Sequence, residues 1–202
     1  MDYDRAVPVS LDQILVIAAT TRELAVSAGW QTLCCGVGPV DAAAATAAAI
    51  ARQAPRVIVH VGIAGSRRVT GLHPPALIVG SASIYCDLGV PERFAPHRVT
   101  PDARLVAAAM RALPGAVSQA IGTSGRVGQT SGCEVEAMEG FAVLRAAALA
   151  GIPAVEVRAI SNAIEEPDRS LWQFDAAFAA VVAATPALVT AIAAAIETGD
   201  PG

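Results

Sequence analysis

The chain has 202 residues and a net charge of −4, and its basic residues form no run, which argues against nucleic acid as a partner. Its length fits one domain with a sizeable core, and much of its 54% hydrophobic content is alanine, so no membrane span is expected. The acidic N-terminus lacks the pattern of a signal peptide, so we expect a cytoplasmic protein.

Two residue types limit the chemistry further. All 14 basic residues are arginine, so Schiff-base and other lysine chemistry is excluded. The four cysteines, at positions 34, 35, 86 and 133, contain no Cys-x-x-Cys pair. We therefore expect neither a metal site nor a disulfide framework, and we interpret the cysteines as buried or inert thiols.

Short apolar runs alternate with alanine-rich helical stretches along the chain. In chain order, the pattern predicts strands at 14–19 and 31–36, a helix at 39–53, strands at 57–61 and 76–82, a helix at 102–113, a strand at 118–122, a helix at 138–150, a strand at 154–160 and a closing helix from Leu171 onward.

Strands separated by helices of this length predict βαβ units. We expect a single α/β domain over residues 1–202, with a twisted, mostly parallel (mixed) central sheet covered by helices on both faces. In open sheets of this kind, ligands bind at the carboxyl ends of the strands. Polar residues that follow a predicted strand are therefore the first candidates for a site.

Glu23 and the run from Gly62 to Gly65 each follow a predicted strand. A carboxylate at the position of Glu23 can activate a water molecule, or it can simply interact with a helix dipole. Two glycines at a strand-to-loop turn let the backbone approach a ligand, although a plain tight turn has the same pattern. The spacing is not Gly-x-Gly-x-x-Gly, so a dinucleotide fold is not indicated.

Two later segments complete the set of candidates. Glu136-Ala-Met-Glu139 is predicted to open a helix, where Met138 offers a polarizable wall and Glu139 a carboxylate that can accept hydrogen bonds from a diol. Alternatively, Glu139 is only a dipole partner in a first helical turn. The strand that follows ends in Ser161 and Asn162, so the pair of segments suggests a site for a ribose carrying a base.

These motifs, in this order, resemble the purine nucleosidase and nucleoside phosphorylase superfamily, and its futalosine hydrolase branch in particular. The resemblance implies that Glu23 is the general base for water, that Met138 and Glu139 hold the ribose, and that Gly62 and Ile63 belong to the loop lining the site. It also implies no cofactor, a small-molecule nucleoside as substrate, and a homodimer or larger assembly.

Asn162 sets the expected base preference. In adenine-specific members of the superfamily the Arg158-to-Asn162 run ends in Ser-Asp, and the Asp protonates the base. An Asn cannot be that acid, but its amide can donate to a 6-oxo group and accept from a protonated N7. Ser124, in a loop expected near the base, and Trp172, expected to begin the last helix, complete the predicted binding residues.

The resemblance therefore implies hydrolysis of the N-glycosidic bond of futalosine, with release of hypoxanthine. Three alternatives stay open. A methylthioadenosine or adenosylhomocysteine nucleosidase is opposed by Asn162, and a purine nucleoside phosphorylase is supported by Arg22 but opposed by Ile63, where phosphorylases usually have Ser. A nucleoside-binding protein without catalysis is opposed by the presence of Glu23.

Overall fold

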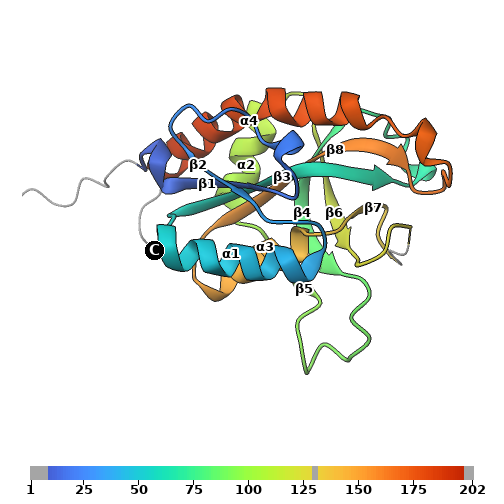
Figure 1. The fold of residues 1–202 in the computed structure, drawn as a ribbon, viewed down its shortest axis with the longest axis horizontal. Coiled ribbons are helices and arrows are strands. Elements are labelled where there is room, and N and C mark those ends of the chain that lie inside the picture. Colours follow the sequence, from blue (N-terminus) through green and yellow to red (C-terminus); the bar gives the residue numbers. More distant parts are fainter. Residues whose placement is uncertain (1–8, 129–131, 198–202) are drawn as a thin grey trace, which may run out of the picture.

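The sheet at the centre of the protein is mixed, as expected. In the computed structural model, which describes residues 9–128 and 132–197, β1 is parallel to β2 and β3, and β3 is parallel to β8 (Figure 1). The strand bounds are β1 Ile14–Ala18, β2 Gln31–Cys34, β3 Val57–Ser66, β4 Leu77–Tyr85, β5 Arg98–Val99, β6 Val117–Thr123, β7 Val135–Ala137 and β8 Ala154–Ala163.

One part of the sheet closes on itself, which the expectation of an open sheet did not include. β8 pairs with both β3 and β4, β4 pairs with β6, β6 with β7, and β7 returns to β3. These pairings form a closed ring of strands. The ring includes β3, which contains the Gly62–Gly65 run, and β8, which contains Ser161 and Asn162. The carboxyl end of β3 is consequently paired with β7 and does not form an open edge.

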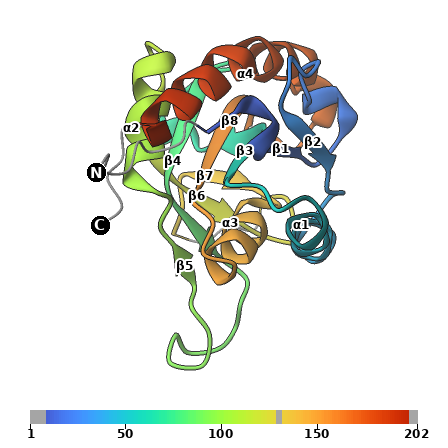
Figure 2. The same cartoon turned by 90° about the vertical axis from the view of Figure 1, so that its left-hand side faces the viewer.

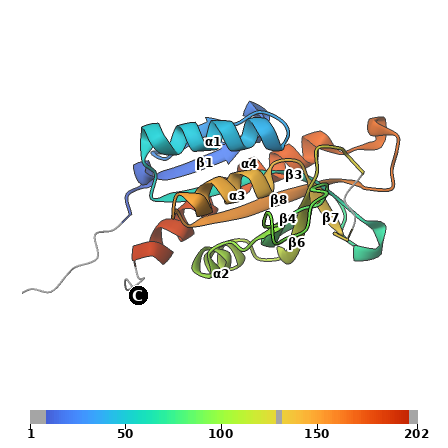
Figure 3. The same cartoon turned by 90° about the horizontal axis from the view of Figure 1, so that it is seen from below.

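Two pairs of helices cover the two faces of the sheet. α1 (Pro39–Gln53) and α3 (Gly140–Leu149) lie on one face, and α2 (Ala103–Ala112) and α4 (Phe174–Glu197) lie on the other (Figure 2). Viewed from below, α1 and α3 run side by side along the sheet (Figure 3). Every residue of β1 is buried because both faces are covered, which is why this strand is a continuous apolar run.

Local signals explain where the helices begin. Pro39 occupies the first turn of α1, where its missing N–H costs nothing. The Asp102 carboxylate accepts hydrogen bonds from the backbone N–H groups of Arg104 and Leu105 and so caps α2. α1 and α2 thus match the predicted helices to within a residue.

The closing helix α4 is the most apolar element. Residues 174–196 are long and apolar enough to cross a membrane, with a mean hydropathy of 2.1, although buried helices of other proteins pass the same test. Here Ala177, Val181, Leu188 and Ile192 lie at the helical spacing that forms one buried stripe, packed on the sheet. In this structure α4 therefore packs against the core of the protein.

Several element boundaries differ from the predictions. β3 continues through the Gly62–Gly65 run, so these glycines are strand residues and not a turn. The segment at Glu136 is a short strand, β7, and α3 begins only at Gly140, after Met138 and Glu139. In each case pairing with distant strands overrides the local pattern.

The closing helix also begins later than predicted. The short 3-10 helix Arg169–Leu171 precedes it, and α4 starts at Phe174. Trp172 therefore lies in the connection between the two and does not begin the last helix.

Candidate active site

A cavity of about 270 Å³ lies at the carboxyl ends of β1, β3 and β8, on the side of the sheet that faces the start of α4. This is where parallel sheets place their ligands. The lining combines carboxylates with an aromatic wall and a run of strand backbone. Its polar and charged members are Thr20, Glu23, Arg126, Glu136, Glu139, Ser161, Asn162 and Arg169, and its larger apolar members are Val37, Ile63, Val127, Met138, Trp172, Phe174 and Phe178.

Glu23 lies in a short 3-10 helix, Thr21–Glu23, directly after β1, and its side chain is buried. One carboxylate oxygen accepts hydrogen bonds from the backbone N–H and the hydroxyl of Thr20, both at 2.8 Å. The other oxygen accepts from the backbone N–H of Ile63 at 3.2 Å. These contacts join the ends of β1 and β3 and fix the carboxylate at the cavity wall.

Met138 and Glu139 reach the cavity from the connection between β7 and α3. One oxygen of Glu139 accepts from the backbone N–H of Gly38, at the start of α1, at 3.0 Å. Its other oxygen lies 3.5 Å from a guanidinium nitrogen of Arg158. Burial raises the pKa of Glu139, although Arg158 and the Gly38 amide oppose that shift, and nearby Glu23 and Glu156 add to it.

A β-bulge between β3 and β8 allows two consecutive residues, Ser161 and Asn162, to line the cavity. Ala64 pairs with Ile160 and Gly65 with Asn162, so Ser161 is the extra residue. In a regular strand these neighbours would point to opposite faces, but the bulge lets both line the cavity. Gly65 permits this approach because a Cβ there would lie only 3.0 Å from the Asn162 amide nitrogen.

The amide of Asn162 is held by its neighbours. Its nitrogen donates to the carbonyl of Ala163 at 3.0 Å, and its oxygen lies 2.8 Å from the hydroxyl of Ser161. That hydroxyl also lies 3.2 Å from the carbonyl of Ala64 and donates to one acceptor at a time. Among the described residues, one N–H and one oxygen lone pair of Asn162 thus have no partner and can bind a ligand.

Beneath the cavity, Arg158 is buried among carboxylates. Its Nε donates to Glu156 at 2.8 Å, and its terminal nitrogens contact Glu139 and the ring of His60. Burial alone would lower the pKa of Arg158, but Glu156, Glu139 and Glu23 together raise it. The guanidinium therefore stays charged and neutralises part of this acidic cluster, as expected for a structural arginine.

His60 is neutral in this environment. Burial, and then the charge of Arg158, hold its pKa well below the usual value. Its Nδ1 lies 3.1 Å from the carbonyl of Ile17, so Nδ1 carries the proton and donates to that oxygen. Nε2 is then free to accept a hydrogen bond from Arg158.

Two glycines leave the space that this cluster occupies. A Cβ on Gly62 would lie 2.2 Å from a guanidinium nitrogen of Arg158, and a Cβ on Gly140 would lie 2.2 Å from a carboxylate oxygen of Glu156. Gly62 itself does not line the cavity, so its expected role as a ligand-facing residue is not what the structure shows. Its contribution is to admit the side chain of Arg158.

The loop after β6 lines the cavity through Arg126 and Val127 but not through Ser124. Ser124 is buried behind them, where its hydroxyl donates toward Asp87 and accepts from the backbone N–H of Arg126 at 3.0 Å. Ser124 is therefore not among the residues that line this cavity, although it was predicted to bind the substrate. Ser124 holds the loop, and the two residues after it face the cavity.

Three aromatic residues line the cavity, of which Trp172 was predicted and Phe174 and Phe178 were not. Phe174 and Phe178, one turn apart on α4, line the cavity beside Trp172. Trp172 donates from its indole nitrogen to the carbonyl of Glu166 at 3.0 Å. Since the chain contains few aromatic residues, three within seven positions were a usable signal.

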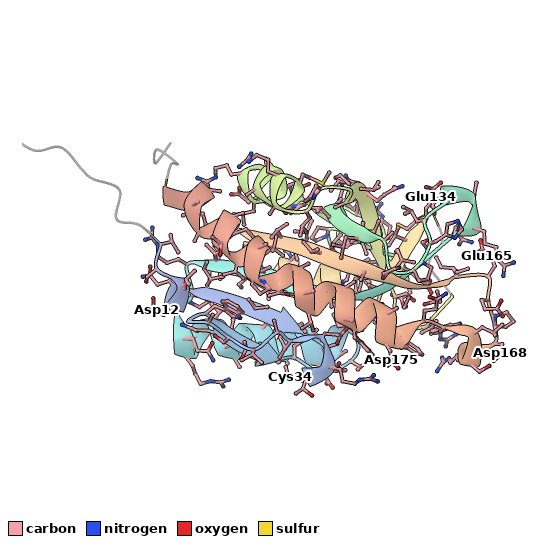
Figure 4. All side chains as sticks on the ribbon, turned by 90° about the horizontal axis from the view of Figure 1, so that it is seen from above. Asp12, Cys34, Glu134, Glu165, Asp168 and Asp175 are labelled. Atoms are coloured by element: carbon pink, nitrogen blue, oxygen red, sulfur yellow. The ribbon has the colours of Figure 1, made fainter. Side chains whose placement is uncertain are left out.

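Arg22 points away from the cavity despite its place beside Glu23. Its guanidinium pairs with Asp175 at 2.5 Å and lies 4.4 Å from the centre of the Phe178 ring, on the outer side of the aromatic wall. Figure 4 shows Asp175 near the start of α4, and Glu165 and Asp168 in the connection before it.

A second groove, of about 560 Å³, lies between α1 and α3. Its described lining is almost wholly apolar, with Arg145 as its charged residue, so it lacks groups for catalysis. Within residues 9–128 and 132–197, no group of three or more His, Cys, Asp or Glu residues is placed to hold a metal ion. The cavity at the strand ends is therefore the candidate site.

The protein is an α/β protein with a partly closed mixed sheet and a cavity at its strand ends. The chain belongs to the phosphorylase superfamily, whose model matches residues 25–194. It is also 37% identical to the futalosine hydrolase of Streptomyces coelicolor, over 76% of this chain and 75% of that relative.

Solved structures share the fold. A 5'-methylthioadenosine/S-adenosylhomocysteine nucleosidase from Colwellia psychrerythraea, in complex with adenine, matches with a TM-score of 0.76 and 21% identity, over 89% of this chain and 95% of that one. Futalosine hydrolase of Helicobacter pylori matches with a TM-score of 0.76 and 15% identity, over 88% of this chain and 97% of that one. The predicted fold class is thus confirmed.

We predict that Gly62→Ala destabilises the protein by about 3 kcal/mol or more, because its Cβ would displace Arg158 and leave buried carboxylates without their partner. The measurement is the free energy of unfolding from urea titration. Gly89→Ala is the matched control, since an exposed Cβ there meets nothing within 4 Å and should change that free energy by less than about 0.5 kcal/mol. Equal effects of the two substitutions would contradict the steric role of Gly62.

Proposed function

We propose that the protein hydrolyses the N-glycosidic bond of futalosine and releases hypoxanthine. The observation that carries this proposal is the convergence of Glu23, Glu139 and Asn162 on one cavity, in a chain 37% identical to a futalosine hydrolase. The three side chains offer a base, a diol acceptor and an amide for a purine. A homodimer or larger assembly and a cytoplasmic location remain predictions.

In the proposed reaction, Glu23 orients and activates the attacking water. Its carboxylate lies at the end of β1, held by Thr20 and Ile63, and still faces the cavity. A fixed carboxylate can accept a proton from water as the water attacks the anomeric carbon. The hydrogen bonds that fix it keep the carboxylate from rotating away.

Glu139 and the cluster beneath it fit the charge that develops on the sugar. Departure of the base gives the ribose oxocarbenium character, which nearby negative charge stabilises. Glu23, Glu139 and Glu156 provide three carboxylates against the single guanidinium of Arg158, so the floor of the site is acidic. Met138 supplies an apolar face for the ring, and Glu139 accepts hydrogen bonds from the 2′ and 3′ hydroxyls.

Asn162 supports a 6-oxopurine as the leaving group. Its free N–H can donate to O6, and its oxygen can accept from a protonated N7. Trp172 and Phe174 provide faces on which a flat base can stack. Arg126, in the loop after β6, adds a further donor to the cavity lining.

Hydrolysis rather than phosphorolysis is supported by the two positions at which related phosphorylases carry a phosphate-binding arginine. Arg22 pairs with Asp175 outside the cavity, and His60, where one phosphorylase group carries a phosphate-binding arginine, is buried and neutral. Ile63 fills the position where phosphorylases usually place Ser. Water is therefore the proposed acceptor of the ribosyl group.

The test of the function is product analysis by mass spectrometry with futalosine, inosine and methylthioadenosine, each with and without phosphate. We expect hypoxanthine from futalosine in both conditions and no ribose phosphate. Faster cleavage of methylthioadenosine than of futalosine would favour the adenine-specific alternative. Binding without cleavage of any of the three would favour a nucleoside-binding protein.

Glu23→Gln should lower kcat at least about 100-fold with little change in substrate affinity, because the base that activates water is lost. Single-turnover kinetics and equilibrium binding separate the two quantities. Arg22→Gln, the neighbouring control, should change kcat less than about threefold, because its exposed ion pair contributes little. Near-normal turnover by Glu23→Gln would remove Glu23 from the mechanism.

As the pH falls, substrate binding should weaken, and it should do so at a higher pH than if it depended on a carboxyl group of ordinary pKa. Burial raises the pKa of Glu139, and only its ionised form accepts two hydrogen bonds from the diol, so KM should rise as the pH falls through that raised pKa. Glu139→Gln should show a high KM without this pH dependence, and should discriminate less between ribo and 2′-deoxy substrates.

The control for that experiment is Glu134→Gln, an exposed carboxylate before β7, which should keep the wild-type profile. An unchanged ribo-to-deoxy preference in Glu139→Gln would exclude Glu139 as the ribose ligand.

Asn162→Asp should shift the ratio of kcat/KM toward adenine nucleosides, because a carboxyl group can protonate N7 and cannot donate to O6 when ionised. We expect wild type to prefer hypoxanthine nucleosides and the variant to lose most of that preference. The shift should be partial, since Arg126 also lines the cavity and offers the base a further donor. If both proteins show the same base preference, Asn162 does not read the base.

A further inference from the structure

Cys86 and Cys133 bring two free thiols together outside the proposed catalytic set. Their sulfur atoms are 3.8 Å apart, although the residues are far apart in the sequence. Cys86 directly follows β4 and is partly exposed, whereas Cys133 precedes β7 and is buried. The sequence pattern had suggested four inert thiols, but this pair is close enough to react with each other.

Each cysteine lies next to a carboxylate that holds the loop after β6. Asp87, beside Cys86, accepts from the backbone N–H of Gly125 at 2.8 Å. Glu136, three residues after Cys133, accepts from the backbone N–H of Gly128 at 2.6 Å. These two contacts anchor the residues on either side of Arg126 and Val127, which line the cavity.

The electrostatic environment favours a reactive thiolate at this pair. A hydrogen bond from Cys86 and the guanidinium groups of Arg98 and Arg67 lower the pKa of Cys133 to about 7, against the opposing effect of burial. The hydrogen bond to Cys133 and burial raise the pKa of Cys86. A thiolate with a neighbouring thiol is the arrangement that forms a disulfide after oxidation.

We propose that Cys86 and Cys133 form a redox-modification site, at which a peroxide converts the two thiols into a disulfide that locks the cavity-lining loop 124–128. The Cys133 sulfur attacks a peroxide oxygen, the O–O bond breaks, and a sulfenic acid and one water form. The Cys86 sulfur then displaces the hydroxyl as a second water. The two sulfurs are oxidised, the peroxide is reduced, and both thiol protons leave in water.

Closing this bond requires a small movement with a defined consequence. The sulfurs must approach from 3.8 Å to about 2.0 Å, which draws the segments that carry Asp87 and Glu136 toward each other. The loop is then anchored at both ends by covalently joined segments, so it opens less often. The effect of the disulfide on turnover rests on the proposed function, since Arg126 and Val127 of this loop line the cavity that would hold the nucleoside.

The first measurement maps the bond in the whole chain. After treatment with hydrogen peroxide and alkylation of remaining thiols, we expect a peptide that links Cys86 to Cys133, while Cys34 and Cys35 are alkylated after unfolding. Dithiothreitol should reverse the link. Cys86→Ser and Cys86→Ala should both abolish it, and Cys34→Ser, an exposed-thiol control, should retain it.

The second measurement reads the loop without any substrate. Hydrogen exchange at the Gly125 and Gly128 amides should slow at least about fivefold in the oxidised protein, because a disulfide restricts opening of the segments that it joins. Turnover should fall with it and recover with dithiothreitol. A chain that cleaves no nucleoside would refute the proposed function while leaving this measurement intact.

Two results would overturn the redox site. One is full alkylation of Cys86 and Cys133 after peroxide treatment. The other is a Cys86–Cys133 bridge with unchanged exchange at the Gly125 and Gly128 amides.

Discussion

The buried guanidinium of Arg158 is the interaction on which the site depends. It lies on β8 and contacts Glu156 on the same strand, Glu139 before α3 and His60 on β3. Without its charge, the carboxylates of this buried cluster would repel one another or take up protons. Arg158 thus connects two strands and the start of a helix beneath the cavity, and it keeps the carboxylates there ionised.

The two halves of the cavity are built differently. The sugar half rests on buried strand ends and fully engaged carboxylates, with Glu23 held by hydrogen bonds from both β1 and β3 sides. The base half combines Asn162, at the end of β8, with Arg126 and Trp172, which lie in connections. The groups proposed to recognise the base therefore come both from the buried sheet and from connections, which vary more easily among related proteins.

The sequence predicted the parts of the fold and site that local pattern determines. Continuous apolar runs such as β1, and capped helices such as α2, follow from burial and end signals, and Glu23, Glu139 and Asn162 follow from short motifs. The pattern could not reveal the bulge at Ser161, because a bulge is a relation between two strands. For the same reason, the steric role of Gly62 was hidden, since the side chain that it admits lies far away in the sequence.

The glycines around the buried cluster have a consequence for how this family can change over time. Gly62 and Gly140 leave the volume that Arg158 and Glu156 fill, so neither glycine can be replaced while those side chains remain. Conversely, a lineage that lost the ion pair would open a void and release both positions to larger residues. These four positions should therefore covary across homologues. Their joint presence in a sequence would indicate a cavity supported by this buried ion pair, even where the residues that face the ligand have diverged.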